Sequence, residues 1–95
     1  MTRNSAHRKR TFPLGQVVIT GNASLRLTTE MVLAALRRHA AGDWGDLSPE
    51  DLLANDEALH NGGRLFSAYG QGQQRFWIIT EDDQSVTTVL LPEDY

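Results

Sequence analysis

Residues 64–91, RLFSAYGQGQQRFWIITEDDQSVTTVLL, decide the fold of this 95-residue chain. Three runs rich in β-branched and aromatic residues, at 64–69, 75–80 and 86–91, are separated by two polar loops of five residues each. Loops of this length typically join antiparallel strands. The segment therefore predicts a three-stranded meander. The run FWII at 76–79 has no polar alternation, which predicts a central middle strand covered on both faces.

Upstream of the meander, the run QVVIT at 16–20 predicts another strand, because it is short, β-branched and bounded by glycines. The next element is a helix that we expect to begin near Thr28 or Thr29 and to end near His39. Its first turn holds Glu30 and its last turn is basic, and both features suit the helix dipole.

A second helix has a more complete start signal. Ser48 is a good N-cap, Pro49 suits the first helical position, and the glycines that follow Asn61 predict the helix end. The element order β-α-α-β-β-β predicts an α+β fold, with an antiparallel sheet of about four strands and two helices on one face. The last strand is expected to be an exposed edge, which allows either a monomer or an edge-strand dimer.

The composition indicates one small domain over residues 13–95, preceded by a flexible basic arm over residues 1–12. The chain has no cysteine, which excludes disulfides and zinc–thiolate sites. No apolar run is long enough to span a membrane, and the basic start lacks the apolar stretch of a secretory signal. A cytoplasmic location is therefore expected, and no cofactor is predicted.

Charge is distributed unevenly along the chain. Residues 1–38 carry seven Arg or Lys and one acid, whereas residues 39–95 carry two Arg and eleven acids, within a formal net charge of −3. Such asymmetry usually concerns partners rather than fold. It favours a binding function.

The six residues GDWGDL at 42–47 join the two predicted helices. In a structural interpretation, Trp44 fills the core while Asp43 and Asp46 bind nearby backbone amides. In a functional interpretation, the loop presents Trp44 to a partner as an anchor, because tryptophan is enriched at binding hot spots.

Two polar residues fall on predicted apolar helix faces, His39 on the first helix and Asp56 on the second. A polar group in a core must be satisfied, so structural roles come first. The alternative is an acid–base dyad of Asp56 with His39 or with His60. Glu57 and His60 have the spacing of half a di-iron motif, but the other ligands are missing and no metal site is predicted.

The basic arm is the candidate for nucleic-acid binding. Arg8, Lys9 and Arg10, together with Arg3 and Arg26, would contact phosphates without choosing a sequence. The acidic body would repel the same backbone, which favours a solvated terminus instead.

Several blocks between residues 13 and 95 resemble a family of small proteins from plasmids and integrative elements of proteobacteria, usually labelled plasmid-related. The matching blocks are GQVV at 15–18, HAAGDWGDL at 39–47, ND at 55–56, GRL at 63–65, SAY at 67–69, WIITE at 77–81 and TTVLLP at 87–92. Residues 20–28 depart from the family pattern, which has Thr-Pro-Gly there. The resemblance implies a bacterial mobile-element setting and no catalytic activity.

These observations rank three functional hypotheses. The first is a non-enzymatic accessory protein of a mobile element, which engages a protein partner through its acidic body and the Trp44 loop. The second is a small toxin-like ribonuclease or other hydrolase. The third is nucleic-acid binding through the arm. The candidate residues of the hydrolase hypothesis are His39, Asp56, Arg64, Tyr69 and Arg75.

Overall fold

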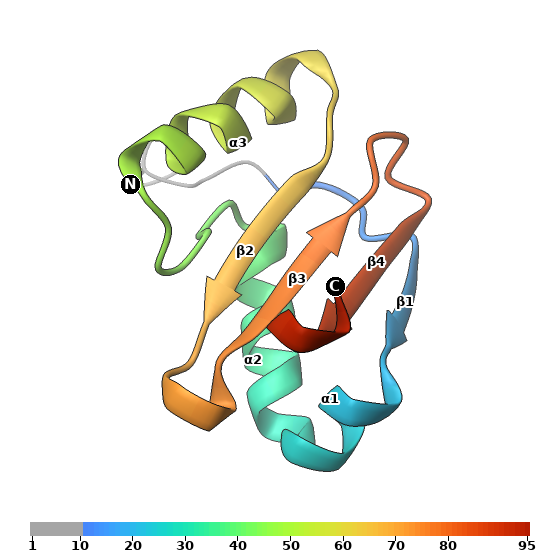
Figure 1. Cartoon of the computed structure of the whole chain (residues 1–95). Coiled ribbons are helices and arrows are strands. Elements are labelled where there is room, and N and C mark those ends of the chain that lie inside the picture. The colour runs from blue at the N-terminus through green and yellow to red at the C-terminus, as the bar shows by residue number, and fades with distance from the viewer. Residues whose placement is uncertain (1–10) are drawn as a thin grey trace, which may run out of the picture.

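The computed structural model describes residues 11–95, and within them it has a mixed four-stranded sheet and three α-helices (Figure 1). The strands lie in the order β1-β4-β3-β2. The elements are β1 (Gln16–Ile19), α1 (Gly21–Arg26), α2 (Thr29–Ala40), α3 (Pro49–Asn61), β2 (Leu65–Tyr69), β3 (Phe76–Thr80) and β4 (Val86–Leu90), with short 3₁₀ turns η2 (Gly72–Gln74) and η3 (Pro92–Asp94).

The α+β class and the C-terminal meander are confirmed. Strand β3 lies between β2 and β4 and is antiparallel to both, with Ile78 opposite Ser67 on one side and Val89 on the other. Strand β1 differs from the predicted antiparallel sheet, because it runs parallel to β4 with Val17 beside Thr87. A parallel pair needs a long connection between its strands. Here the rest of the domain supplies it, and β4 becomes an inner strand rather than the predicted edge.

The helix starts follow the local capping signals. The side chain of Thr28 accepts a hydrogen bond from the Met31 amide at the start of α2, and Ser48 accepts one from the Asp51 amide at the start of α3. Helix α1 was not predicted. It has six residues, with Thr20 as its N-cap, and its first turn contains no acidic residue.

Helices α1 and α2 cover one face of the sheet, while α3 packs at the edge of β2 (Figure 1). The main core joins side chains of α1 and α2 to buried sheet residues such as Ile78 and Val89. A second core lies beneath α3 and contains Phe12, Trp44 and Leu65. Phe12 was predicted to belong to the flexible arm. It is buried, and its amide donates to the Ala40 carbonyl, so it is part of the folded domain.

The opposite face of the sheet is turned toward the viewer in Figure 1 and carries no α-helix among the described elements. The chain crosses it after β4 as the short turn η3, which ends beside the sheet near the C-terminus. This surface, which no described α-helix covers, is called the open face below. Its side chains alternate along each strand with those that point into the helix-covered core.

Candidate functional site

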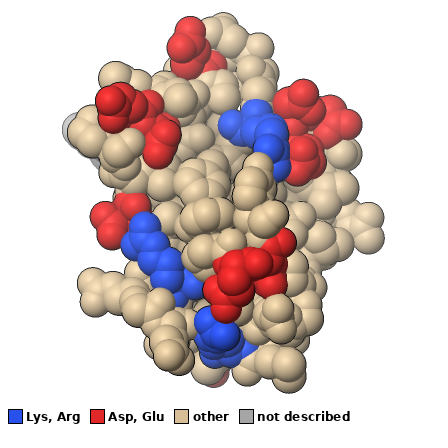
Figure 2. All heavy atoms as spheres, viewed as in Figure 1, with Lys and Arg blue, Asp and Glu red and all other residues tan. Residues whose placement is uncertain are grey.

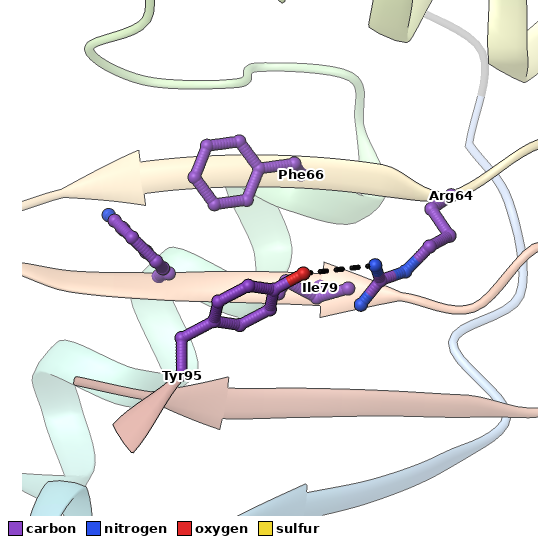
Figure 3. A pocket seen from close by; sticks show the side chains of 5 residues that line it. Arg64, Phe66, Ile79 and Tyr95 are labelled. Carbon is purple, nitrogen blue, oxygen red and sulfur yellow. Dashed lines mark hydrogen bonds between the residues drawn. The ribbon is translucent and has the colours of Figure 1, made fainter. Parts of the chain in front are cut away.

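An apolar pocket of about 290 Å³ lies on the open face of the sheet. Neighbouring positions of β2 and β3 supply Phe66, Trp77 and Ile79 to it, because Phe66 is opposite Ile79 in the strand register. Arg64 and Tyr95 complete the lining (Figure 3). Residues of β2 and β3 therefore form the floor of the pocket. Its rim is formed by Arg64, just before β2, and by Tyr95, just after η3.

The aromatic rings in the pocket form a continuous row. The ring centroids of Phe66 and Trp77 are 5.1 Å apart with an interplanar angle of 76°, and those of Trp77 and Tyr95 are 5.9 Å apart at 70°. Edge-to-face geometry of this kind stabilises aromatic pairs. Trp77 and Phe66 are half-buried and Tyr95 is 72% exposed, so the row presents aromatic surface to solvent.

Turn η3 places Tyr95 at the pocket. The Asp94 carboxylate accepts from the Thr20 hydroxyl at 2.6 Å, from Asn22 Nδ2 at 2.8 Å and from the Leu91 amide at 3.1 Å. These hydrogen bonds, that of Thr20 first, lower the pKa of Asp94. Hydrogen bonds thus hold η3 against the start of α1, which is more than 70 residues away in the sequence.

Arg64 is held at the rim of the pocket by two partners. Its Nη1 donates to the Tyr95 hydroxyl at 3.2 Å (Figure 3). Its Nε lies 3.4 Å from Glu81 Oε1. The hydrogen bond with Tyr95 is the main cause that raises the pKa of Arg64, with the charge of Glu81 adding to it. The guanidinium therefore stays charged, and the carboxylate of Glu81 offsets part of that charge at the rim of the apolar pocket.

Acidic residues outnumber basic ones over the described body as a whole, although Arg64 is the one charged residue that lines the pocket. Residues 11–95 contain five Arg, no Lys and twelve Asp or Glu. Figure 2 shows a small uncharged area near the middle of the open face, with several red patches around it and each blue patch next to a red one. The open face therefore combines the aromatic pocket with acidic groups around it, and these surrounding acidic groups are called the acidic periphery below.

The Trp44 loop does not form this surface. Trp44 is 4% exposed and packs in the second core against Phe12 and His39, while its Nε1 donates to Asp56 Oδ1 at 3.1 Å. Asp43 accepts from Arg38 at 2.7 Å and from the Gly45 amide. The contacts of Trp44 and Asp43 agree with the structural interpretation, whereas the Asp46 carboxylate binds the Arg75 guanidinium rather than a backbone amide. In this structure Trp44 is buried and is not available as an anchor.

His39 is fully buried and is bound by two hydroxyls. Its Nδ1 lies 2.5 Å from Ser67 Oγ and its Nε2 lies 2.9 Å from Thr80 Oγ1. Thr80 in turn bonds Thr87, whose hydroxyl donates to the Leu14 carbonyl at 2.6 Å. The Leu14 carbonyl can only accept, so the Thr87 hydroxyl donates to it and must accept from the Thr80 hydroxyl. The Thr80 oxygen then accepts from His39, which places the ring proton on Nε2. Burial lowers the pKa of His39 to about 4, which keeps the ring neutral.

The acid–base dyads considered as an alternative for Asp56 are not formed in the structure. His39 bonds Ser67 and Thr80, and His60 Nδ1 lies 2.9 Å from the backbone carbonyl of Asp56 rather than its carboxylate. Asp56 is exposed, and the buried polar residue of α3 is its neighbour Asn55. The apolar face of α3 is therefore one position away from the predicted one.

The other predicted site residues are dispersed. Asp46 pairs with Arg75 at 3.1 Å. Tyr69 is buried, its hydroxyl donates to the Asp43 carbonyl at 2.7 Å, and burial raises its pKa to about 12. The candidates of the basic arm lie outside the described residues; they are Arg8, Lys9 and Arg10. Residues 11–95 contain no group of three side chains able to hold a metal ion, and no helix in that range is long and apolar enough to cross a membrane.

The sequence interpretation missed the pocket. It expected the strand at 75–80 to be covered on both faces, whereas Trp77 faces the open side. Phe66 and Trp77 share a face through the register of β2 and β3, and the uniformly apolar run at 76–79 contains no alternation that would mark this face as the outer one. Comparison of the chain with family models, curated proteins and solved structures finds no match.

Proposed function

We propose that the protein is a non-enzymatic binding protein that holds a protein partner on the open face of its sheet. An apolar side chain of the partner occupies the pocket at Trp77, and Lys or Arg residues of the partner lie against the acidic periphery. The proposal keeps the function expected from the charge pattern and moves the contact from the Trp44 loop to the opposite side of the sheet.

The row formed by Phe66, Trp77 and Tyr95 is the observation that carries this proposal. Aromatic side chains dominate interface energetics, and they do so best when a pocket desolvates their partner. The floor of this pocket is set by strand register, so it is preorganised and loses little entropy on binding. A concave apolar site with a few polar groups at its rim is the usual form of a binding site.

Charge defines the kind of partner. A described body with twelve acids and five Arg attracts basic segments and repels acidic ones. Complementary charge raises association rates and specificity more than affinity, and salt screens it. We therefore expect the partner segment to be basic as well as apolar, and its binding to weaken as ionic strength rises.

The contacts of the hydrolase candidates support a non-enzymatic function. His39 is buried and neutral, Tyr69 binds the Asp43 carbonyl, and Arg75 is paired with Asp46. Each group is engaged in holding the fold. The mobile-element setting and the cytoplasmic location belong to the proposal as expectations from the sequence alone, the first of them by resemblance.

A peptide library displayed on phage and selected against the purified full chain tests the proposal. We expect enriched peptides to combine an aromatic or large aliphatic residue with Lys or Arg. Tyr95→Ala should weaken their binding about tenfold, because Tyr95 forms the pocket wall and a hot-spot contact is worth at least 1–2 kcal/mol. Tyr95 is largely exposed, so its truncation leaves the core intact.

Leu53→Ala is the matched control, because Leu53 is 69% exposed on α3 and lies outside the pocket. Its affinity for the selected peptides should equal that of the wild type. The proposal is overturned if the selected peptides bind Tyr95→Ala as tightly as the wild type. It is also overturned if they carry no basic residue and their affinity is the same at high salt. The same assay run with oligo(U) and oligo(dT) reports on the other class of ligand. Tight oligonucleotide binding that quenches tryptophan fluorescence would assign the aromatic row to base stacking instead.

A further inference from the structure

The two edges of the described sheet are treated differently by the fold. At β2, the outward-facing backbone groups of Phe66 both bind Asn55, whose Oδ1 accepts at 3.0 Å and whose Nδ2 donates at 2.5 Å. The next outward pair belongs to Ala68, whose amide donates to the Trp44 carbonyl at 3.1 Å and whose carbonyl accepts from the Asp46 amide at 2.8 Å. Helix α3 and the loop before it thus close this edge.

The edge at β1 is open. The amides of Gln16 and Thr20 donate to the Ser85 and Val89 carbonyls of the β4 side at 2.9 and 3.0 Å. Because backbone groups alternate along a strand, those of Val17 and Ile19 point away from β4. Both residues are more than 40% exposed, and no hydrogen bond within residues 11–95 reaches their outward groups.

Among the described residues, strand β1 also lacks most of the usual edge protection, its short length of four residues being the exception. Natural edges carry lysine, proline, bulges or a covering element. Residues 16–19 are QVVI, and the whole stretch from 11 to 25 contains no charged residue, in a described body that carries twelve acids and five Arg. A basic partner finds no opposite charge here, whereas a second copy of the same stretch meets no repulsion.

We propose that two copies of the chain join through antiparallel pairing of β1 with β1. In the matching register, Val17 of each copy is opposite Ile19 of the other, and the two-fold axis passes near Val18. An antiparallel pair of this kind exchanges both of its hydrogen bonds. The register therefore uses all four outward backbone groups of each strand and gives a continuous eight-stranded sheet.

A groove beside β1 enlarges the interface. It has a volume of about 240 Å³ on the helix-covered side and includes Ile19, Leu27, Val32 and Leu33. The two-fold axis stands perpendicular to the sheet, so both α2 helices lie on the same side and their grooves face each other. Leu33 is 48% exposed in one chain. A strand pair of four residues alone is below the ~1,200 Å² that specific interfaces bury, and the groove adds apolar area to it.

The oligomeric state of the full chain, measured by sedimentation velocity over a wide concentration range, tests this proposal. At the higher concentrations, the molar mass measured for the wild type should be twice that of one chain. Val17→Lys should be monomeric at the same concentrations, because it places a charge at the pairing edge. Leu53→Lys, an exposed site on α3, should still dimerise. Circular dichroism of each variant establishes that it is folded.

Mixing two variants tests the register. Ile19→Glu should also be monomeric alone, while an equimolar mixture with Val17→Lys should form a heterodimer, because Lys and Glu then stand opposite each other. Hydrogen exchange supplies a readout that needs no variant. The Val17 and Ile19 amides should gain protection as the wild-type concentration rises, whereas those of Phe66 and Ala68 should be protected throughout.

A wild-type chain that stays monomeric at every concentration overturns the proposal and leaves the edge to a foreign strand. A dimer that survives Val17→Lys, or that forms without protection of the Val17 and Ile19 amides, overturns the edge as the interface. A mixture that remains monomeric overturns the register.

Discussion

Asn55 binds both backbone groups of Phe66, accepting from its amide at 3.0 Å and donating to its carbonyl at 2.5 Å. A side-chain amide has one acceptor and one donor group in the same arrangement as a peptide unit. The helix residue thus replaces a neighbouring strand. It connects α3 to the sheet by hydrogen bonds. Apolar packing alone would leave the outward amide and carbonyl of Phe66 on β2 without hydrogen-bond partners.

Asn55→Ala should lower the free energy of unfolding by about 2 kcal/mol, because it leaves the part-buried amide and carbonyl of Phe66 without their partner. Urea unfolding monitored by circular dichroism measures the change. Asp56→Asn is the control at the adjacent exposed position and keeps an acceptor for Trp44 Nε1. Equal stability of the two variants would refute the role assigned to Asn55.

Stability should decline as the pH falls from about 6.5 to 4, because of His39. Its folded pKa is about 4 against a usual 6.5, so within this window the unfolded chain binds a proton that the folded chain does not. The unfolded state is then favoured by up to about 3 kcal/mol at the acid end of the window. Urea titrations at neutral pH and at the acid end measure this loss.

His39→Gln supplies the comparison for the pH experiment. Glutamine keeps a donor and an acceptor for Ser67 and Thr80 but does not titrate. The variant should be less stable than the wild type at neutral pH and should lack most of the decline between pH 6.5 and 4. A decline as steep as that of the wild type would assign the effect to other groups.

Alkaline conditions should reveal Tyr69. Its folded pKa is about 12, above the usual 10, so the unfolded chain loses the phenolic proton first and stability falls as the pH rises through that interval. Tyr69→Phe should remove this dependence and cost about 1 kcal/mol at neutral pH, because the Asp43 carbonyl loses its donor. Phenolate absorbance, recorded against pH, follows the titration directly. A Tyr69 that ionises near pH 10 in the folded protein would contradict the burial of its hydroxyl.

Asp94→Ala should release the C-terminal turn from α1 and open the pocket without unfolding the domain. The variant loses the hydrogen bonds to Thr20 and Asn22 that hold Tyr95 over Trp77. Acrylamide should then quench tryptophan emission more strongly than in the wild type. Trp44 is buried and supplies a constant background.

Two further variants serve as the positive and the negative control of the quenching experiment. Tyr95→Ala should give the same increase, because it removes the ring itself, and Glu50→Gln on α3 should give none. Unchanged quenching in both Asp94→Ala and Tyr95→Ala would show that Tyr95 does not cover Trp77 in solution.

The parts of the fold that depend on local chemistry were predictable from the sequence. The Ser48 cap with Pro49 and the glycines after Asn61 place α3, and the β-branched runs place the meander. Helix α1 was missed because six residues give too little periodicity. The face of α3 was misassigned by one position because Leu53 is an exposed leucine that resembles a core residue.

The candidate site was not predictable, because it is set by contacts remote in sequence. Tyr95 reaches the pocket through the hydrogen bond of Asp94 to Thr20, a residue 74 positions away. The parallel placement of β1 beside β4 is likewise a tertiary choice. A pattern of residues shows which side chains share a strand face, but not which face a helix leaves uncovered.

The closure of β2 has a consequence for how the protein behaves when crowded. Growth of a sheet by strand addition needs a free edge at both ends of the growing unit, and here one end is sealed by Asn55 and by the backbone of residues 44–46. When one chain adds to another at β1, the new outer edges are again the sealed ones. Edge pairing in this molecule is therefore self-terminating, and an open-ended fibre would first have to break the seal.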